Sequence, residues 1–198
     1  MDGSRVTLLR ELLAGTGWVE STAEFAGGLH AAVTRRSARP GGLLLVGGEA
    51  EEPWHLAAHL TDEAGWCGVP ELAPTLVRHR VPDGAPGHLA VPLRRLEEAR
   101  RNETVFVVGG GGLGEGVLQR VSDARRTGAT VLALEDGDPE LRALAHEALA
   151  APGGDDPVTL DVLQHLVSSA AGTARRGGAR ALLRRWFPPA GSAADLRW

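Results

Sequence analysis

The segment Thr104–Asp136 constrains the fold more than any other part of the sequence. It opens with residues 104–108, an apolar run rich in β-formers, which is typical of a strand buried on both faces of a parallel sheet. Six glycines follow within Gly109–Gly116, and an apolar pattern with helical spacing then leads to Gly128, a residue that commonly ends a helix. A second apolar run, residues 131–134, completes the unit. A strand–loop–helix–strand unit of this kind predicts a parallel sheet with a right-handed crossover.

Composition narrows the class of protein. A chain of 198 residues with 43% hydrophobic content suits one domain with a sizeable core. No apolar run approaches the roughly 18 residues of a membrane span, and the charged N-terminal segment lacks the apolar core of a signal peptide. A single cysteine, Cys67, fits a reducing compartment. We therefore expect a cytoplasmic protein with no membrane partner.

The charged residues exclude some kinds of chemistry. The net charge of −4 gives no support to a nucleic-acid partner. The sequence contains no lysine, so all 21 basic residues are arginine. This excludes a Schiff-base lysine and the lysine of a phosphate-binding P-loop.

Helices and strands are expected to alternate along the rest of the chain. Strands are predicted at 43–46, 75–81, 104–108, 131–134 and 148–151, and helices at 4–15, from Ser21 or Thr22 to Arg36, and at 53–64, 93–101, 139–148 and 159–171. The pattern predicts an α/β fold: a three-layer, doubly wound, five-stranded parallel sheet in the flavodoxin-like order 2-1-3-4-5, with extra terminal helices. Residues 1–172 would form this domain, and 173–198 a basic helix or tail suited to subunit packing.

Two glycine-rich loops are expected to meet at one edge of this sheet. The loops 47–52 and 109–116 follow the first and third strands, and ligands of doubly wound sheets bind in the crevice between those strands. The predicted ligand-binding residues are Gly47, Gly48, Glu49, Gly109, Gly110, Gly111, Gly112, Gly114 and Glu115.

The stretch VGGEAEEPWHLAAHL resembles the first loop and following helix of the sugar isomerase (SIS) family, in particular its phosphoheptose isomerase branch. The resemblance covers roughly residues 20–172. The family has an asparagine-glycine-glycine-serine loop, then a metal-binding histidine with a glutamate four residues later. Here Gly47 and Gly48 match the glycines, Glu49 replaces the serine, His55 matches the histidine and His59 stands at the glutamate. The resemblance implies a sugar-derivative ligand and a homodimer or homotetramer.

This sequence departs from the family in the groups that would bind phosphate. Both loops lack the serine and threonine hydroxyls of the family. Four carboxylates, those of Glu49, Glu51, Glu52 and Glu115, lie beside the crevice instead and would repel a phosphate unless arginine or a metal neutralises them. Alternatively, these glutamates face solvent and stabilise helix N-termini. We therefore expect a binding protein that is non-catalytic or has diverged from the isomerases.

A zinc site is the second hypothesis. His55 and His59 lie one helical turn apart and could share a metal, with Gln164, His165 or a loop glutamate as a third ligand. Gln164 also matches the glutamine of the family's late helix, whereas Gly172 stands where the family has a histidine. Such a site would favour a phosphosugar isomerase. The alternative is that two histidines share a polar helix face by chance.

A nucleotide-binding hypothesis rests on the second loop. Gly109, Gly111 and Gly114 match the dinucleotide fingerprint, and Glu135 ends the next strand, where an acidic residue would hold a ribose hydroxyl of NAD. However, only about 60 residues follow this unit, which is too few for the second half of a dinucleotide-binding fold. A third possibility is an oligomeric scaffold with a vestigial crevice.

Overall fold

The computed structural model describes residues 3–35, 42–49, 51–110, 112–153 and 156–186. Its strands are β1 (Leu43–Val46), β2 (Pro74–Val77), β3 (Thr104–Gly110), β4 (Thr130–Asp136) and β5 (Glu147–Ala150). Its α-helices are α1 (Gly3–Leu12), α2 (Trp18–Val33), α3 (Trp54–Cys67), α4 (Glu115–Arg126), α5 (Pro139–Leu144) and α6 (Leu160–Trp186). Three short 3₁₀ turns complete the described elements: η1 (Pro70–Leu72), η2 (Gly87–Leu89) and η3 (Leu93–Leu96).

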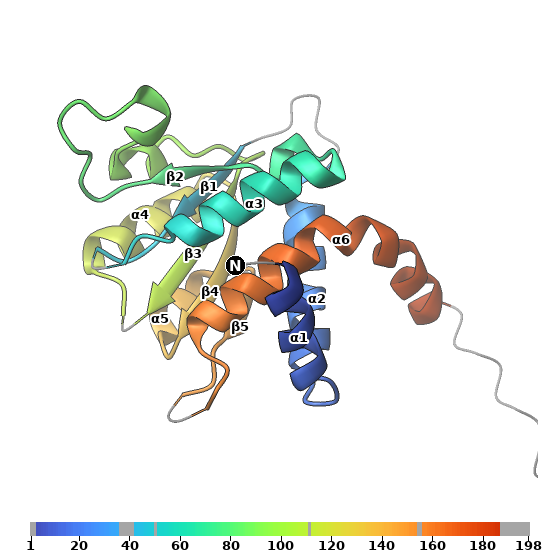
Figure 1. Cartoon of the computed structure of the whole chain (residues 1–198). Helices are drawn as coiled ribbons and strands as arrows, with labels where there is room; N and C mark the ends of the chain where they lie inside the picture. The colour runs from blue at the N-terminus through green and yellow to red at the C-terminus, as the bar shows by residue number, and fades with distance from the viewer. Residues whose placement is uncertain (1–2, 36–41, 50, 111, 154–155, 187–198) are drawn as a thin grey trace, which may run out of the picture.

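The five strands form one parallel sheet in the order β2-β1-β3-β4-β5, which confirms the predicted topology (Figure 1). At the centre of the sheet Val46 of β1 pairs with Val107 of β3. Because the strands are parallel, the loops that leave β1 and β3 emerge at the same edge.

Helices cover both faces of the sheet, giving three layers (Figure 1). On one face, Leu43, Leu45 and Phe106 pack with the apolar residues of α2, α3 and α6. On the other face, alternate strand residues such as Leu44 and Val105 pack with α4, α5 and η3. Burial on both faces explains why the strands are apolar without alternation.

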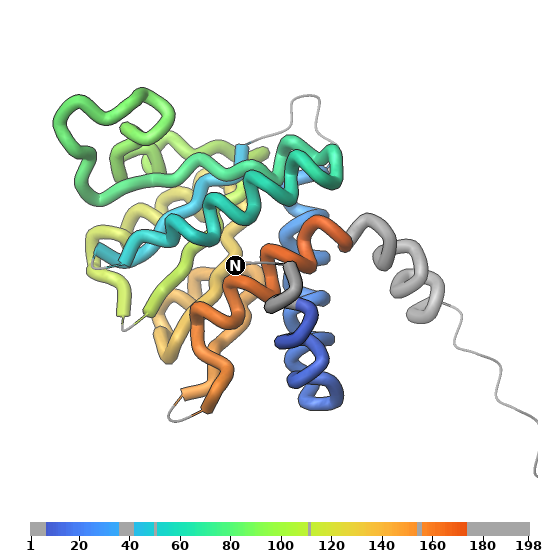
Figure 2. The backbone as a smooth tube through the Cα atoms, viewed as in Figure 1, coloured from blue at the N-terminus to red at the C-terminus, as the bar shows by residue number. Residues whose placement is uncertain are grey.

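The long helix α6 crosses the first of these layers and packs against both α2 and α3 (Figure 2). It runs without a break past the predicted domain boundary at residues 172/173, and its backbone is helical as far as Trp186. The division of the chain at that boundary stays a prediction, and residues 187–198 lie outside the described residues. Within the described part of the chain, no helix has both the length and the apolar character that a membrane span requires.

The second predicted helix begins earlier than expected. Gly17 (φ +85°) precedes α2, which starts at Trp18 rather than after a cap at Ser21 or Thr22. The Thr22 hydroxyl donates to the Trp18 carbonyl at 2.7 Å, so this threonine lies within the helix and does not cap it. Threonine is common at helix N-caps, but here its hydroxyl bonds to a carbonyl of the preceding helical turn, which threonine also does inside helices.

Four other elements are shorter than predicted, and the first of them, α1, ends at Leu12 rather than at residue 15. The strand expected at 75–81 ends at Val77, after which only a single bridge, between Arg78 and Pro92, continues the pairing. The helix expected at 93–101 is the 3₁₀ turn η3, followed by further bonds of i→i+3 type. After these, the Arg100 backbone N–H donates to the Glu103 carboxylate at 2.8 Å. The helix expected at 139–148 ends at Leu144, since β5 begins three residues later.

Candidate functional site

A cavity of about 130 Å³ lies at the carboxyl edge of the sheet, between the loops that follow β1 and β3 and the first turns of α3 and α6. This arrangement confirms that the two glycine loops meet at one crevice. Of the predicted ligand-binding residues, Gly48, Glu49, Gly110 and Gly112 line this inner cavity. The described residues of its wall do not include Gly47, Gly109, Gly114 or Glu115, and Gly111 lies outside the described residues.

Gly47 has a packing role in the first loop. A Cβ placed on it would lie 2.5 Å from Pro53 Cδ and 2.6 Å from the Glu51 carbonyl oxygen, closer than real Cβ atoms approach. The Gly47 carbonyl oxygen lies 2.9 Å from His79 Nε2. The glycine therefore lets the loop fold back tightly onto the start of α3, and the histidine holds it from the β2 side.

The second loop packs against the start of α5 and the residue before it. The Leu113 side chain lies against Gly109, where an added Cβ would be 3.3 Å from Leu113 Cγ and 3.1 Å from Leu141 Cδ2. The Leu113 backbone N–H donates to Asp138 Oδ2 at 3.0 Å. Gly112 has a φ of +91°, a conformation that residues with a side chain rarely adopt. Packing and turn geometry therefore account for at least two glycines of this loop.

Glu135, the acidic residue of the nucleotide hypothesis, is fully buried and already bonded. Its Oε1 accepts from Arg142 Nε at 2.8 Å, and its Oε2 accepts from the Asp138 backbone N–H at 2.8 Å. Asp138 in turn caps α5, as predicted, by accepting from the Leu141 N–H at 2.9 Å. The carboxylate that would hold a ribose hydroxyl thus holds the turn between β4 and α5.

Two of the loop glutamates are paired with arginines that follow β2. Glu52 Oε2 accepts from Arg78 Nε at 2.9 Å, and both side chains are largely buried, with 13% and 14% exposed. Glu49 Oε1 accepts from Arg80 Nη2 at 2.9 Å, but these two side chains are exposed. Residues 78–80, an arginine-histidine-arginine triplet, were not among the predicted site residues. The predicted strand order could have identified these residues. It places the second strand beside the first, and therefore residues 78–80 beside the first loop.

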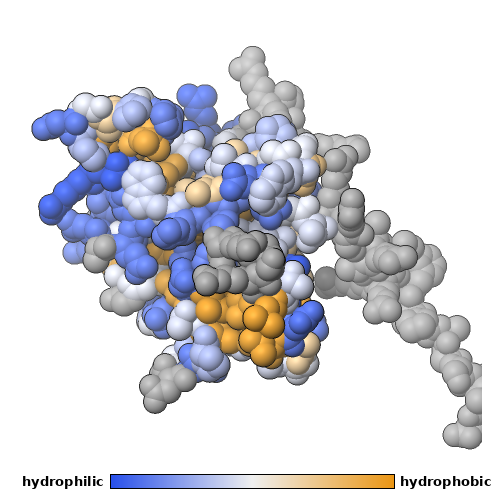
Figure 3. Space-filling view, viewed as in Figure 1, coloured by the Kyte–Doolittle hydropathy of each residue, from blue (hydrophilic) through white to orange (hydrophobic). Residues whose placement is uncertain are grey.

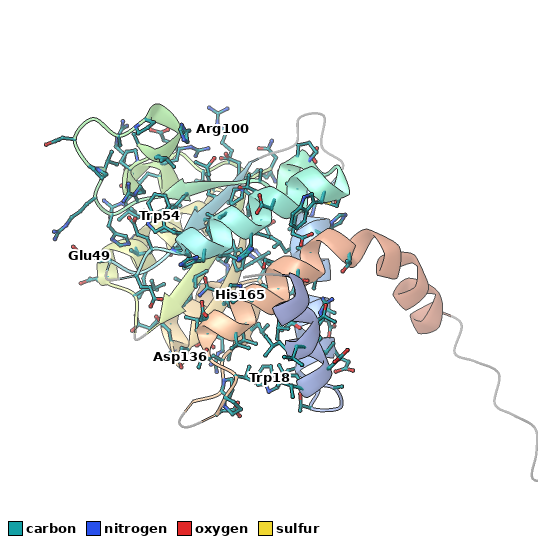
Figure 4. The ribbon with its side chains drawn as sticks, in the orientation of Figure 1. Trp18, Glu49, Trp54, Arg100, Asp136 and His165 are labelled. Carbon is teal, nitrogen blue, oxygen red and sulfur yellow. The ribbon has the colours of Figure 1, made fainter. Side chains whose placement is uncertain are left out.

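A second, outer cavity of about 430 Å³ adjoins the inner one and has the guanidinium groups of Arg78 and Arg80 in its wall. Trp54 lines both cavities, and its ring lies 4.5 Å from the Arg78 guanidinium carbon, a cation–π contact. Figure 4 shows Trp54 at the start of α3 and Glu49 in the loop before it. Glu49, Glu51 and Glu52 line both cavities, and the two arginines line the outer one.

The two histidines of the zinc hypothesis point to different surroundings. His55 lines the inner cavity, whereas the His59 ring packs edge-on against His165 of α6, with centroids 5.0 Å apart. Burial, as the largest cause, lowers the pKa of both His59 and His165. In the parts of the chain that the structure describes, no group of three or more histidine, cysteine, aspartate or glutamate side chains is arranged to hold a metal ion.

Gln164 and Asp161 complete the inner cavity from the first turns of α6. Gln164 is 8% exposed, and its side chain forms no hydrogen bond with any described residue. Asp161 is exposed, with Oδ2 at 3.7 Å from His165 Nε2. Gln164 was predicted as a metal ligand, while Asp161 was missed because nothing in its neighbourhood distinguishes it from an ordinary first-turn acid.

No protein-family model matches the sequence, and no curated protein matches it. Solved structures do match its fold. The sugar isomerase domain of the RpiR transcription factor from Sphaerobacter thermophilus superposes with a TM-score of 0.51 at 19% identity, covering 82% of this chain and 85% of that one. The C-terminal domain of glucosamine-fructose-6-phosphate aminotransferase from Francisella tularensis gives 0.52 at 12% identity, covering 86% of this chain and 44% of that one. The sheet order, the position of the crevice and these likenesses together show that the chain has the fold of a sugar isomerase domain.

Proposed function

We propose that this chain binds a sugar derivative or another small polar metabolite in the inner cavity, without catalysing its conversion. The observation that carries the proposal is Gln164, a residue only 8% exposed that lines the cavity and whose amide has no hydrogen-bond partner among the described residues. Buried polar groups are normally hydrogen-bonded, so an unmet amide in a cavity favours a polar ligand. A crevice between strands 1 and 3 is also where doubly wound folds bind their ligands.

The residues around the cavity support binding rather than isomerisation. Isomerisation needs an acid and a base positioned at the reacting atoms. Glu52 forms an ion pair with Arg78, and His59, which packs against His165, is not among the described residues of the cavity wall. His55 and Glu49 remain in the cavity wall, but Glu49 pairs with Arg80 at the exposed rim.

Calorimetric titration with a panel of neutral, amino and phosphorylated sugars tests this function. We expect saturable binding of at least one sugar and a large loss of affinity in Gln164→Leu, which keeps the side-chain volume and removes the amide. Gln119→Leu, a glutamine on the far helix α4 bonded to Asp123, is the matched control. Absence of binding across the panel, or equal affinity in Gln164→Leu, would contradict the proposal.

The second candidate function is a phosphosugar isomerase with zinc at His55. It is favoured by one observation, that His55 and Gln164 line the same cavity. Interconversion of aldose and ketose phosphates by the zinc-loaded protein, lost in His55→Ala, would support it. The nucleotide hypothesis has its own test: because Glu135 is fully bonded, we expect NAD to leave the melting temperature unchanged.

A further inference from the structure

We infer that the inner cavity receives an ammonium group carried by the ligand, so that amino sugars bind in preference to their hydroxyl or acetamido counterparts. This inference rests on the proposed function and specifies the ligand of the same cavity. It follows from three groups in the cavity wall, Glu51, Asp161 and Gln164, whose capacity to accept hydrogen bonds is unmet.

Four carboxylates line the cavity, but two of them are already paired. Glu52 binds Arg78, and Glu49 binds Arg80. Glu51 has no ion-pair partner among the described residues. Among the described residues, Asp161 has an ion-pair contact with His165, whose pKa is lowered mainly by burial. Neither Glu51 nor Asp161 therefore forms an ion pair with a described arginine.

Gln164 is the independent observation that distinguishes this cavity from an ordinary acidic surface. The residue lies in a helix, where its backbone is enclosed, so the part that reaches the cavity is its side chain. It is more than nine-tenths buried and unpartnered. An ammonium group has three donor hydrogens and no acceptor, which matches two carboxylates and one amide oxygen.

The same wall is poorly suited to an anion. Its described residues carry no serine, threonine or arginine side chain, and the two residues of the loops outside the described ranges, Ala50 and Gly111, cannot supply one. The guanidinium groups of Arg78 and Arg80 face the outer cavity instead. The positive N-terminal end of α6 already carries the Asp161 carboxylate in its first turn. At the start of α3, the Trp54 N–H donates to the Glu52 backbone carbonyl at 2.8 Å.

The test compares three matched ligands that differ at a single position: 2-amino-2-deoxyglucose, glucose and N-acetylglucosamine, with the galactose series as a second scaffold. At a pH below the pKa of the amine, we expect the amino sugar of at least one scaffold to bind about tenfold more tightly than the other two, equivalent to about 1.4 kcal/mol. Glu51→Gln and Asp161→Asn should each weaken the amino sugar severalfold and leave the neutral sugar within about twofold.

The control variant is Glu140→Gln, which removes one exposed carboxylate in α5, away from the cavity. It should change none of the affinities. Equal binding of the amino and neutral sugars, or an amino-sugar affinity that survives both neutralising substitutions, would overturn the inference and leave the proposed function in place. Failure of every sugar to bind would instead overturn the proposed function, and this inference with it.

Discussion

The Glu52 carboxylate accepts a hydrogen bond from Arg78 Nε at 2.9 Å and a second one from the His79 backbone N–H at 3.3 Å. These contacts join the loop after β1 to the segment after β2. They also neutralise one of the carboxylates that would otherwise repel an anion, and they hold Arg78 against the Trp54 ring. The pair is therefore a structural part of the crevice wall and is not free to act as a base.

Removing Arg78 should destabilise the protein. Arg78→Met keeps much of the contact with Trp54 but leaves Glu52, whose side chain is 13% exposed, without its cation. A buried hydrogen bond to a charged group is worth about 1.5–3 kcal/mol, and we expect a loss of unfolding free energy in that range by urea denaturation. The second substitution Glu52→Gln should recover part of the loss.

Arg80→Met is the matched control for that series. Its pair with Glu49 is exposed on both sides, so its removal should leave the urea midpoint within experimental error. A loss of stability as large as that of Arg78→Met would show that burial of the Glu52–Arg78 pair does not determine its contribution to stability.

The order of the strands and the meeting of the two loops could be predicted because their signals are local. Apolar runs, glycines and helix caps mark β1, β3 and β4 within a few residues each, and the Asp138 cap of α5 is read the same way. The pairing of Glu52 with Arg78 spans 26 residues of sequence. This pairing depends on the end of β2 at Val77, whereas the sequence predicted a strand that continues to residue 81.

The glycines of the loops illustrate a second limit of sequence reasoning. Gly47 and Gly109 were predicted to approach a ligand, and the structure gives each a packing reason to lack a side chain. Sequence alone does not separate these reasons, since both require the same residue. Their contact with a ligand stays a prediction.

Restoring hydroxyl groups should restore phosphate binding only when the loop carboxylates are also neutralised. Gly114 is the N-cap of α4, has an extended conformation (φ −61°, ψ 146°) and has open space where a Cβ would stand. We expect Gly111→Ser with Gly114→Ser to leave glucose 6-phosphate binding weak by calorimetry. Adding Glu49→Gln and Glu115→Gln should raise the affinity, because this removes two negative charges and releases Arg80.

Two comparisons control this experiment. The two glutamine substitutions without the serines should give a smaller gain, and Gly114→Ser alone should stabilise α4 by about a few tenths of a kcal/mol through capping. Tight binding of glucose 6-phosphate by the unmodified protein would show that neither the missing hydroxyls nor the acidic loops prevent phosphate binding.

We expect that the protein does not bind zinc. His55 lines the cavity, whereas the His59 ring packs against His165 and is not among the described residues of the cavity wall. We expect no zinc by elemental analysis of the purified protein and no shift of melting temperature on adding zinc. A shift that disappears in His55→Ala and at a pH below about 6.5 would instead establish the metal site.

Self-association is predicted through α1. Leu8 and Leu12 of this helix are 56% and 71% exposed, and Figure 3 shows apolar side chains gathered in the region of α1 and the first half of α6. Exposed apolar patches commonly mark interfaces. We expect a homodimer or homotetramer by light scattering, converted to a monomer by Leu8→Glu with Leu12→Glu. Trp66→Glu, on an exposed site of α3, is the control.

Acid should loosen the contact between α3 and α6. Burial is the main cause that lowers the pKa of His59 and of His165, and for His165 the Asp161 carboxylate opposes it in part. The folded state therefore prefers the neutral imidazoles, and the unfolded state takes up protons first as the pH falls through about 6.5. The stabilisation is complete above that pH and is lost below it, as two imidazolium charges would face each other at a ring separation of 5.0 Å.

Urea denaturation at a series of pH values measures this effect. The midpoint should fall between about pH 7 and pH 5, and the fall should be smaller in His165→Gln, which cannot take up the second charge. His88→Gln, a change in the 3₁₀ turn η2 away from α3 and α6, should keep the full dependence. Glu63 and Glu147 act in the opposite sense, because burial raises the pKa of each carboxyl above its usual value. They favour the folded state as the pH falls toward their range, so a midpoint that rises on acidification would show that these carboxyls outweigh the histidine pair.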